Sequence, residues 1–494
     1  MEDLERPFPP GRYDVIVVGS GPGGLQTSHS LTTLGVHHAV LSQDEAPGGM
    51  FRRFPIFERL ISWTQPDAPV PRTTREYQWY DHNSLAGESD RLRGLVAEFM
   101  DRSFDVPARW EMEAALEAFV ERAGVQVRYG CRWTGTRRED DGGLVLETTD
   151  GDYSCRFAVF AIGVTAPWVP SIEGAELAEH YVDTRPPAAY RDRRVVIIGK
   201  RNSGFELGNG LLPWARELVL VSPRPVQLEP LPYSPLRLRY LQPYEEYVRG
   251  GAGTTVVDAA IEGIERSSGA LRVVAEGTTR PGRLEFDADD VILATGFQAP
   301  LQDLREIGVA TVMNDRIPAL SPFFESLSAP GIFFAGNVSV GSRGVRKNGI
   351  APSTGVSGFR YNARVVARHI AGRLGLSPAE PRIPSDELVA FLARELSGAP
   401  ELWIQKNFLA RVVNLSGGEA RDQGILPLEH FLDSGGDDAV AAVIEMKPDG
   451  AIYPALYVRR TGRIAEHELP PHPLHAFSGE NYQREIDAIL RPLL

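Results

Sequence analysis

Tyr13-Asp14-Val15-Ile16-Val17-Val18-Gly19-Ser20-Gly21-Pro22-Gly23-Gly24 joins a short β-branched run to a cluster of glycines. Such a run, stopped by glycines, is typical of a buried parallel strand. Residues 25–34 then predict a helix that Gly35 closes, and His38-Ala39-Val40-Leu41 predicts the next strand. The sequence therefore predicts a βαβ unit with the glycine cluster at its first turn.

The glycine cluster fits the G-x-G-x-x-G pattern between a strand and a helix. Gly19 makes the tight turn, Gly21 lets a pyrophosphate approach the backbone, and Gly24 lets the helix pack closely. The N-terminus of the helix then faces the phosphates. We therefore predict a dinucleotide site whose contacts come from Gly19, Gly21, Pro22, Gly23, Gly24, Ser42, Gln43, Gly48, Gly49 and Met50.

Ser42 ends the second strand, at the position where an acidic residue usually binds the ribose hydroxyls. Gln43, Asp44 or Glu45 could supply that contact instead, or the contact could be weaker in this chain. The sequence leaves both interpretations open.

The same pattern recurs in the middle of the chain. Arg194-Val195-Val196-Ile197-Ile198 predicts a strand, and a glycine-bearing turn, an apolar helix and a strand over 218–221 follow it. Between the two units we expect a helix over 110–123 and strands over 125–129, 144–148 and 157–160. This alternation predicts an α/β fold with two Rossmann-like dinucleotide-binding domains.

The segments after residue 290 indicate how the domains are arranged along the chain. Strands over 290–293 and 331–334 and a long helix over 356–373 are interpreted as a return to the first domain. The proline-punctuated residues 376–384 precede a C-terminal α+β extension with a hairpin around Pro448-Asp449-Gly450. We therefore assign 1–165 and 291–375 to the first domain, 166–290 to the inserted second domain and 385–494 to the extension.

The second glycine loop, Gly199-Lys200-Arg201-Asn202-Ser203-Gly204, departs from the pattern at Arg201, where a glycine would admit the phosphate. Either Arg201 turns outward and pairs with a phosphate, or it fills the groove and this domain is a vestigial structural unit. The next strand ends in Ser222-Pro223-Arg224 without an acidic residue, which favours a 2'-phosphate held by Arg224, and hence NADPH over NADH. The predicted contacts are Gly199, Arg201, Asn202, Ser203, Gly204 and Arg224.

Composition restricts the classes of partner. The net charge of −13 disfavours nucleic acid and anionic membranes, and no long apolar run predicts a membrane span. The acidic, proline-broken N-terminus does not resemble a secretory signal, so we expect a cytoplasmic protein. Cys131 and Cys155 form no Cys-x-x-Cys pair, and the histidines form no zinc-type cluster, so neither a redox dithiol nor a metal site is predicted.

With both loops placed, the chain resembles the class B flavoprotein monooxygenase superfamily, and within it the ER flavoprotein associated with degradation and its bacterial relatives. The resemblance spans nearly the whole chain. It is carried by Phe54-Pro55, Leu60-Ile61-Ser62, Trp79, Asn83-Ser84-Leu85, Asn202-Ser203, Phe205-Glu206, Arg346-Lys347 and Gly358-Phe359-Arg360-Tyr361.

The resemblance implies FAD in the first domain and NADPH in the second. It also implies that Thr295 and Gly296 belong to an Ala-Thr-Gly linker between the domains, with Ala161-Ile162-Gly163 as its partner. Gly336-Asn337 would lie beside the FAD ribityl chain. The helix N-terminus at Gly355 and Val356 would point its dipole at the flavin pyrimidine.

The resemblance also implies candidates for the reaction site. Asn83 would lie near the reactive edge of the flavin, or else be an ordinary loop residue that caps a turn. His82 and Trp79 would line the pocket, or else belong to a core. Arg346 and Lys347 would bind a substrate or cofactor anion, or else lie in a solvated loop.

The implied activity is an NADPH-dependent monooxygenase that forms a C4a-(hydro)peroxyflavin with O2 and oxygenates a small organic substrate. One departure restrains this assignment, because the histidine fingerprint of Baeyer-Villiger enzymes is not recognisable around Glu179 to Thr184. A non-oxygenating flavin oxidase, or a reductase that passes electrons to another protein, is therefore a second hypothesis. A flavin-stabilised binding protein that uses the extension as its interface is a third. The substrate and the oligomeric state are not predicted.

Overall fold

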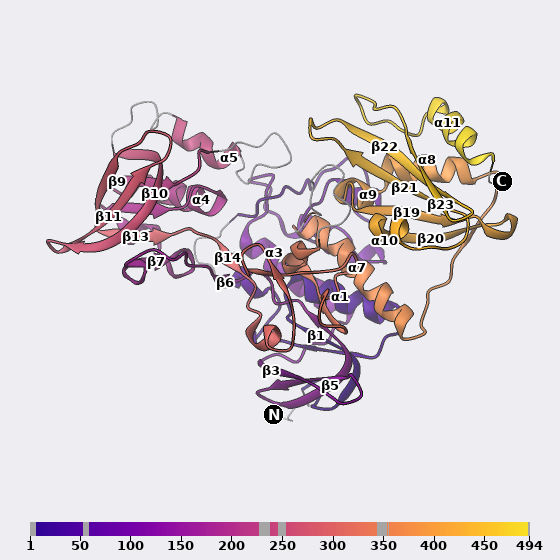
Figure 1. The fold of residues 1–494 in the computed structure, drawn as a ribbon, viewed down its shortest axis with the longest axis horizontal. Helices are drawn as coiled ribbons and strands as arrows, with labels where there is room; N and C mark the ends of the chain where they lie inside the picture. Colours follow the sequence, from indigo (N-terminus) through magenta and orange to yellow (C-terminus); the bar gives the residue numbers. More distant parts are fainter. Residues whose placement is uncertain are drawn as a thin grey trace. The chain divides into compact units, whose positions relative to one another are not determined.

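The computed structural model describes residues 6–52, 59–226, 238–245, 253–342, 353 and 355–492. The chain forms two compact units (Figure 1). The first unit comprises Met1–Gly49, Ser62–Val164 and Ala299–Leu494, and the second comprises Met50–Ile61 and Thr165–Gln298. Both units combine helices with mixed sheets, so the predicted α/β class is confirmed.

The first unit contains a six-stranded sheet in which β2, β1, β5 and β17 run parallel and β3, β4 and β5 form an antiparallel meander. The long strand β5 pairs along one part of its length with β4 and along another with β17. The strands are β1 Arg12–Val18, β2 His38–Leu41, β3 Trp133–Arg138, β4 Leu144–Thr148, β5 Gly151–Phe160 and β17 Ile332–Phe334. The main helices are α1 Pro22–Thr33, α2 Leu95–Phe99, α3 Arg109–Ala123 and α7 Val356–Arg373.

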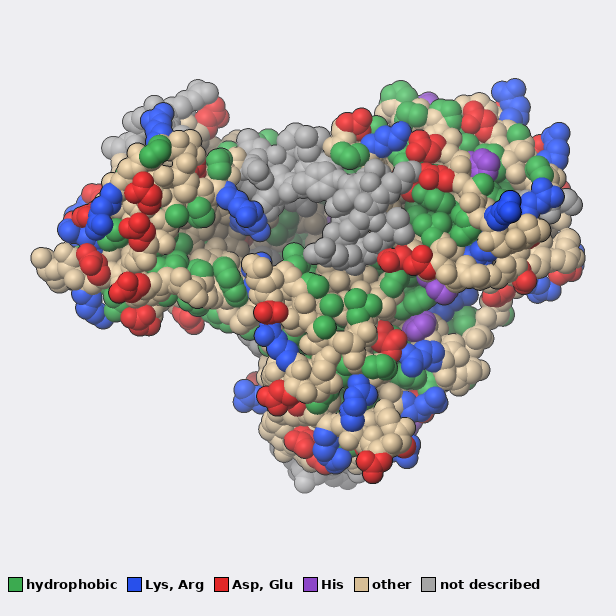
Figure 2. All heavy atoms as spheres, viewed as in Figure 1, with side chains coloured by type: hydrophobic (Ala, Val, Ile, Leu, Met, Phe, Trp, Pro, Cys, Tyr) green, Lys and Arg blue, Asp and Glu red, His purple; other side chains and the backbone are tan. Residues whose placement is uncertain are grey.

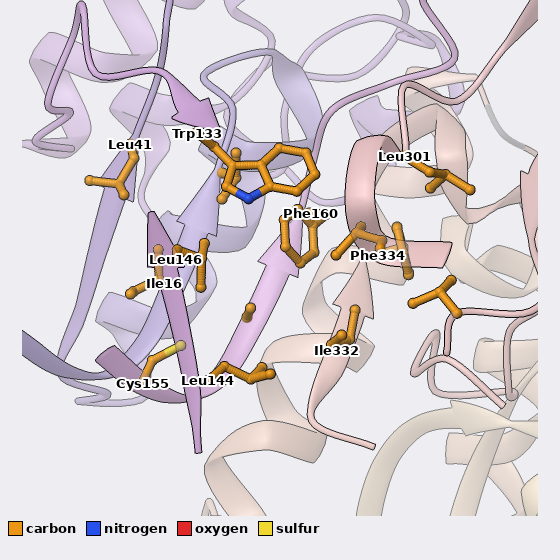
Figure 3. Packing of buried hydrophobic residues seen from close by; sticks show 14 of the residues in the cluster. Ile16, Leu41, Trp133, Leu144, Leu146, Cys155, Phe160, Leu301, Ile332 and Phe334 are labelled. Carbon is orange, nitrogen blue, oxygen red and sulfur yellow. The ribbon is translucent and has the colours of Figure 1, made fainter. Parts of the chain in front are cut away.

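The core of this sheet is formed by β-branched and aromatic side chains from its strands. Figure 3 shows the rings of Trp133, Phe160 and Phe334 close together in this core. Ile332 lies on β17 with Phe334, and Ile16 lies on β1, which pairs with β5. The rings of Trp133 and Phe160 are 4.8 Å apart between centroids. Burial of such rings is the main source of stability for a sheet of this kind.

The C-terminal part of the first unit is a second sheet, entirely antiparallel, in the order β18-β20-β19-β21-β22-β23. Its alternate side chains pack against α8, α9 and α11 on one face and against α10 on the other. The strands are β18 Arg382–Ile383, β19 Leu409–Asn414, β20 Ala420–Pro427, β21 Ala439–Met446, β22 Ile452–Arg460 and β23 Arg463–Glu468. The helices are α8 Leu388–Gly398, α9 Pro400–Ile404, α10 Leu428–Asp433 and α11 Glu480–Leu490. The predicted hairpin is β21 and β22.

The second unit has a seven-stranded sheet in the order β12-β11-β10-β9-β8-β13-β7. Strands β10, β9, β8, β13 and β7 run parallel, and β10, β11 and β12 form an antiparallel meander. The elements are β7 Glu179–His180, β8 Arg194–Ile198, α4 Asn202–Leu211, β9 Glu217–Ser222, α5 Leu238–Leu241, β10 Thr254–Ser267, β11 Ala270–Gly277, β12 Arg283–Ala288 and β13 Asp290–Leu293. A short ribbon, β6 Ala166–Pro167 with β14 Phe297–Gln298, completes it.

Two expectations are corrected. Asp290–Leu293 was expected to return to the first domain, but β13 pairs in parallel with β8 and belongs to the second unit, which ends at Gln298 rather than at residue 290. A short apolar run does not indicate which of two parallel sheets it joins. Residues 125–129 were expected to form a strand, yet they contribute a single bridge from Arg128 to Leu41.

On the face drawn in Figure 2, acidic and basic side chains are interspersed. Among the described residues, no helix combines the length and apolar character needed to cross a lipid bilayer.

Candidate functional site

The first glycine loop joins the end of β1 to the start of α1. Gly19 has a φ of +113°, and a Cβ placed there would lie 2.5 Å from the carbonyl oxygen of Ala161. A Cβ on Gly24 would lie 1.9 Å from the carbonyl oxygen of Gly19. The roles predicted for these two glycines, a tight turn and close helix packing, therefore match the local geometry.

Gly21 differs from its neighbours because a Cβ placed there would meet no atom within 4 Å. Gly21 is also the N-cap of α1, and no side chain caps this helix. The backbone at Gly21 thus borders open space at the positive end of a helix, the arrangement that accepts a phosphate. Pro22 and Gly23 form the first turn and are buried.

The Gly336-Asn337 segment meets this loop directly. A Cβ on Gly23 would lie 2.5 Å from the Cα of Gly336, which itself has a φ of +80°. Asn337 follows in the same turn and is partly exposed. Two segments more than three hundred residues apart in sequence therefore share one edge of the sheet, as the dinucleotide prediction requires.

Ser42 is buried, and its hydroxyl is occupied by contacts within the protein. It lies 2.8 Å from the hydroxyl of Ser20, and it accepts a hydrogen bond from the backbone N–H of Asp44 at 3.2 Å. Gln43 is exposed, and the Asp44 carboxylate would lie 3.8 Å from a Cβ on Gly49. The Ser42 hydroxyl thus has partners within the protein, and Gln43, Asp44 and Glu45 all stay predictions for the ribose contact.

The remaining residues predicted for this loop lie on the following turn. Gly48 donates its N–H to the carbonyl of Ser20 at 3.3 Å, and Gly48 and Gly49 both have positive φ. Gly49 and Met50 begin a 3-10 turn that ends at Arg52.

Helix α7 packs along α1 (Figure 1). It begins at Val356 with Gly355 as its N-cap, and no side chain of the described residues caps this end. Gln405, at the end of α9, fixes this end of α7. Its amide hydrogen-bonds the backbone N–H of Ser353 at 2.6 Å and the side chain of Asn362 at 2.6 Å.

Asn83 lies in a loop organised by the carboxylate of Asp81. Asp81 accepts hydrogen bonds from Thr64, from the N–H of Asn83 and from the N–H of Ser84, all at 2.9 to 3.0 Å. The Asn83 amide nitrogen donates to the Ser62 carbonyl and to Thr64, both at 2.9 Å. Within the described part of the chain, Asn83 Oδ1 accepts no hydrogen bond, so only this oxygen is available to a ligand.

His82 and Trp79 flank this loop. His82 packs on Trp63 with 4.8 Å between ring centroids, and burial together with the nearby Arg360 lowers the pKa of His82 to about 4. It is therefore neutral at pH 7. Trp79 donates its indole N–H to the carbonyl of Gly398 at 2.9 Å and packs against Trp403, so it also joins the loop to the C-terminal sheet.

Arg360 explains why the Gly-Phe-Arg-Tyr segment matters. It is fully buried on α7 and donates to the carbonyls of Asp81 and Ser84 at 2.9 Å and of Gln78 at 3.1 Å. A buried charge needs such partners. Arg360 therefore holds the Asn83 loop against α7, a role that the sequence did not indicate.

Lys406 is a second residue that the sequence did not single out. Its ammonium donates to the carbonyl of Trp403 and lies 5.4 Å from the Trp403 ring. Burial lowers its pKa to about 8, and its charge contributes to the lowered pKa of His82. A single lysine after an apolar turn gives no pattern that could have identified it.

The predicted basic pair Arg346 and Lys347, and Phe54-Pro55 of the resemblance, lie outside the described residues. In the rest of the chain, no group of His, Cys, Asp and Glu side chains is placed to hold a metal ion.

The second glycine loop repeats the geometry of the first inside the second unit. Gly199 has a φ of +134°, and a Cβ placed there would lie 2.3 Å from the carbonyl oxygen of Ala294. A Cβ on Gly204 would lie 2.1 Å from the carbonyl oxygen of Gly199. Arg201 is the N-cap of α4, with extended backbone and an exposed side chain. Asn202 and Ser203, which follow it, are partly exposed.

Two basic residues at this edge of the second sheet, Lys200 and Arg224, differ in whether they have an acidic partner. Lys200 is buried and pairs with Asp258, and the hydrogen bond from Lys200 lowers the pKa of that carboxyl. Arg224, beyond the end of β9, is exposed and makes no hydrogen bond or ion pair with the described residues. The carboxyl ends of β8 and β9 lie side by side, since Ile198 is paired with Val221.

The predicted linkers lie where the chain crosses between the units, at Val164–Thr165 and at Gln298–Ala299. Thr295 donates its hydroxyl to the carbonyl of Trp168 at 2.6 Å, and Gly296, with a φ of +98°, accepts from the N–H of Trp168. The His180 ring also contacts the Gly296 carbonyl, at 3.1 Å, so its role here is structural.

Comparison with known proteins adds family evidence. The model of the pyridine nucleotide-disulphide oxidoreductase family matches residues 16–336. FAD-dependent oxidoreductase domain-containing protein 2 of Danio rerio is 29% identical over 44% of this chain and 31% of its own length. The protein of the same name from Mus musculus is 24% identical over 81% of this chain and 64% of its own length. The chain thus spans less than two thirds of these relatives.

Two solved structures share the fold of most of the chain. A flavin-containing monooxygenase from Stenotrophomonas maltophilia has a TM-score of 0.56 at 18% identity, covering 74% of this chain and 99% of its own. A bacillithiol disulfide reductase from Staphylococcus aureus has a TM-score of 0.57 at 16% identity, covering 74% and 99%. At these identities the likeness concerns the fold alone.

Proposed function

Because the chain belongs to the pyridine nucleotide-disulphide oxidoreductase family, we propose that it is an FAD-dependent oxidoreductase that takes its electrons from NADPH. Members of this family use FAD and NADP(H), in agreement with the two cofactors predicted from the sequence. The observation that carries the proposal is the open backbone at Gly21, on the uncapped N-terminus of α1 and beside the loop that contains Gly336.

When bound, FAD would accept a hydride from NADPH and pass electrons to the final acceptor. The residues of the chain would position and shield it. The first turn of α1 would hold the pyrophosphate, and the N-terminus of α7 would stabilise negative charge on the reduced flavin. Asn83 Oδ1 would accept a hydrogen bond from a ligand, and His82, neutral at pH 7, would add no charge beside it.

The finer proposal is monooxygenation of a small organic substrate with O2. It is supported by the absence of the dithiol that disulphide reduction requires, since Cys131 and Cys155 form no Cys-x-x-Cys pair. Both thiols are buried, and burial raises the pKa of each, that of Cys155 to about 12. Neither is a thiolate at pH 7, so neither is prepared to attack a disulphide.

A second candidate is a non-oxygenating oxidase or reductase. It is favoured by Arg201, which replaces a loop glycine, and by His180, which the structure uses to hold Gly296. Anaerobic titration of the FAD-loaded protein with NADPH separates the cases, because an inert second unit would leave the flavin oxidised. If the flavin is reduced, a ratio of H2O2 formed to NADPH consumed near one with every substrate tested would reject monooxygenation.

The cofactor site itself is tested by Gly21→Ala. We expect FAD occupancy to fall at least tenfold while the unfolding midpoint of the flavin-free protein stays unchanged, since the added methyl meets only open space. Gly435→Ala is the matched control, because a Cβ there also meets no atom within 4 Å and the residue lies in an exposed loop. Full FAD occupancy in Gly21→Ala would contradict the proposed site.

A further inference from the structure

A pocket of about 290 Å³ lies beside the C-terminal part of α7. It is lined by Phe323, Val365, Arg368, His369, Gly372, Arg373 and Leu426, which come from α7, from β20 and from the loop before β17. Arg368 is thirteen residues from Gly355, the N-cap of α7, which at the rise of an α-helix is roughly 20 Å. The pocket is therefore separate from the proposed cofactor site.

Arg368 is the unusual residue of this pocket. Its side chain is partly buried, yet it makes no hydrogen bond or ion pair with any residue that the structure describes. Burial lowers the pKa of its guanidinium in spite of Asp422 and Glu380 nearby. Both carboxylates have other partners, because Arg411 pairs with Asp422 and Gln423 donates to Glu380 at 3.3 Å. The guanidinium is thus partly desolvated and has donors that no described residue uses, and a bound anion would accept hydrogen bonds from them.

Gly424 on β20 makes room for this guanidinium. It has a φ of +81°, and a Cβ placed there would lie 2.4 Å from Nη1 of Arg368. The other arginine of the pocket is different, since Arg373 pairs with Glu325 at 2.8 Å and lies over the Phe157 ring. Only one of the two arginines is therefore left to meet a ligand.

The rest of the lining is flat and apolar. Phe323 stacks on His369, with centroids 4.1 Å apart and planes 14° apart, and contacts His430 edge-on at 4.7 Å. Burial lowers the pKa of both histidines, so neither adds charge at pH 7. Val365 and Leu426 complete the apolar wall. In Figure 2, His side chains lie beside Lys and Arg side chains where α7 and α10 run in Figure 1.

We propose that this pocket binds a small carboxylate with an aromatic body, whose carboxylate pairs with Arg368 and whose ring packs against Phe323. A planar guanidinium matches a carboxylate with two parallel hydrogen bonds, and the apolar wall selects against a bare anion. Arg368 alone balances the negative charge of the carboxylate, so the proposal needs no second charged residue in the lining. The proposal does not depend on the redox activity, because the pocket shares no residue with the cofactor loops.

Benzoate is the probe, and calorimetric titration of the full-length, FAD-loaded protein is the measurement. We expect saturable one-site binding of benzoate, with benzamide and inorganic phosphate at least tenfold weaker because each lacks either the charge or the ring. Arg368→Met should weaken benzoate binding at least tenfold without lowering the unfolding midpoint, since it removes a partly buried charge that has no partner among the described residues. Arg382→Met, which changes an exposed arginine on β18, is the control and should bind as the wild type does.

Leu426→Trp provides a second test that keeps the charge but fills the pocket, and it should also weaken benzoate at least tenfold. Benzoate affinity unchanged in either variant would overturn the proposal. So would the absence of benzoate binding at millimolar concentration, or phosphate binding as tightly as benzoate, which would indicate a site for bare anions.

Discussion

At the scale of single residues, we propose that the arginines at one edge of the second unit select NADPH over NADH. Lys200 pairs with Asp258, whereas Arg224 has no partner among the described residues. Arg201 is the N-cap residue of α4, and its exposed side chain makes no capping hydrogen bond. Outward pairing of Arg201 with a phosphate stays a prediction, as does the alternative that Arg201 fills the groove. An extra 2'-phosphate would add one or two charge-assisted hydrogen bonds to Arg224.

Arg224→Ala is therefore expected to raise the KM for NADPH roughly tenfold to a hundredfold, the equivalent of one or two such bonds. The KM for NADH should change little. Steady-state kinetics with both nucleotides give the comparison, and Arg280→Ala, on an exposed turn of the same unit, is the control. An equal rise in KM for NADPH and NADH would show that Arg224 does not bind the 2'-phosphate.

His82 gives the stability a pH dependence. Its pKa is about 4 in the folded protein and about 6.5 when unfolded, so the unfolded state binds the extra proton between these values. The contribution of His82 is present above pH 6.5 and is lost as pH falls toward 4. Between pH 7 and pH 5 the wild type should lose about 2 kcal/mol more stability than His82→Gln. Urea unfolding at both pH values tests this, and parallel losses in the two proteins would refute it.

At the scale of elements, α7 connects most of the candidate site, and the sequence predicted its bounds correctly. The glycine loops were also predictable, because local strand, turn and helix signals specify them. The position of Asn83 was suggested only by resemblance, and the network of Asp81, Thr64 and Arg360 that holds it was not predicted. That network joins segments nearly three hundred residues apart, and a local sequence pattern cannot predict contacts between such distant segments.

Arg360→Met tests whether α7 organises the Asn83 loop. The substitution keeps an apolar side chain of some length but leaves three buried carbonyls without their donor, so we expect a loss of roughly 3 kcal/mol. Arg394→Met, at an exposed position of α8, makes the same change of side chain and should alter the stability by under about 0.5 kcal/mol. Denaturant unfolding of the two variants provides the measurement, and similar losses would show that Arg360 has no special role.

At the scale of the whole molecule, the C-terminal extension is attached to the rest of the first unit through polar contacts that the sequence did not indicate. Arg75 pairs with Glu395 and Glu401, both at 2.8 Å, and Gln405 holds the start of α7. The hairpin was predictable because its turn is local, whereas the attachment depends on buried carboxylates that look like ordinary surface residues in the sequence. The extension therefore shapes the candidate site instead of standing apart from it.

Glu401→Gln measures the strength of that attachment. Burial alone would raise the pKa of Glu401, but Arg75 and Arg364 outweigh it and hold the pKa below its usual value. The stabilisation is thus present above the unfolded pKa of about 4.3 and is lost as pH falls through the folded pKa. At pH 7 we expect the variant to be less stable by roughly 2 kcal/mol, because it loses one of the two ion pairs of Arg75. The loss is limited because Glu395 still pairs with Arg75. The difference should shrink as the pH falls through the folded pKa, since the wild-type carboxyl is then protonated as well. Glu387→Gln, at an exposed position before α8, should match the wild type at every pH. A destabilisation of Glu401→Gln that stayed constant down to pH 3 would mean that packing, and not the ion pair, attaches the extension.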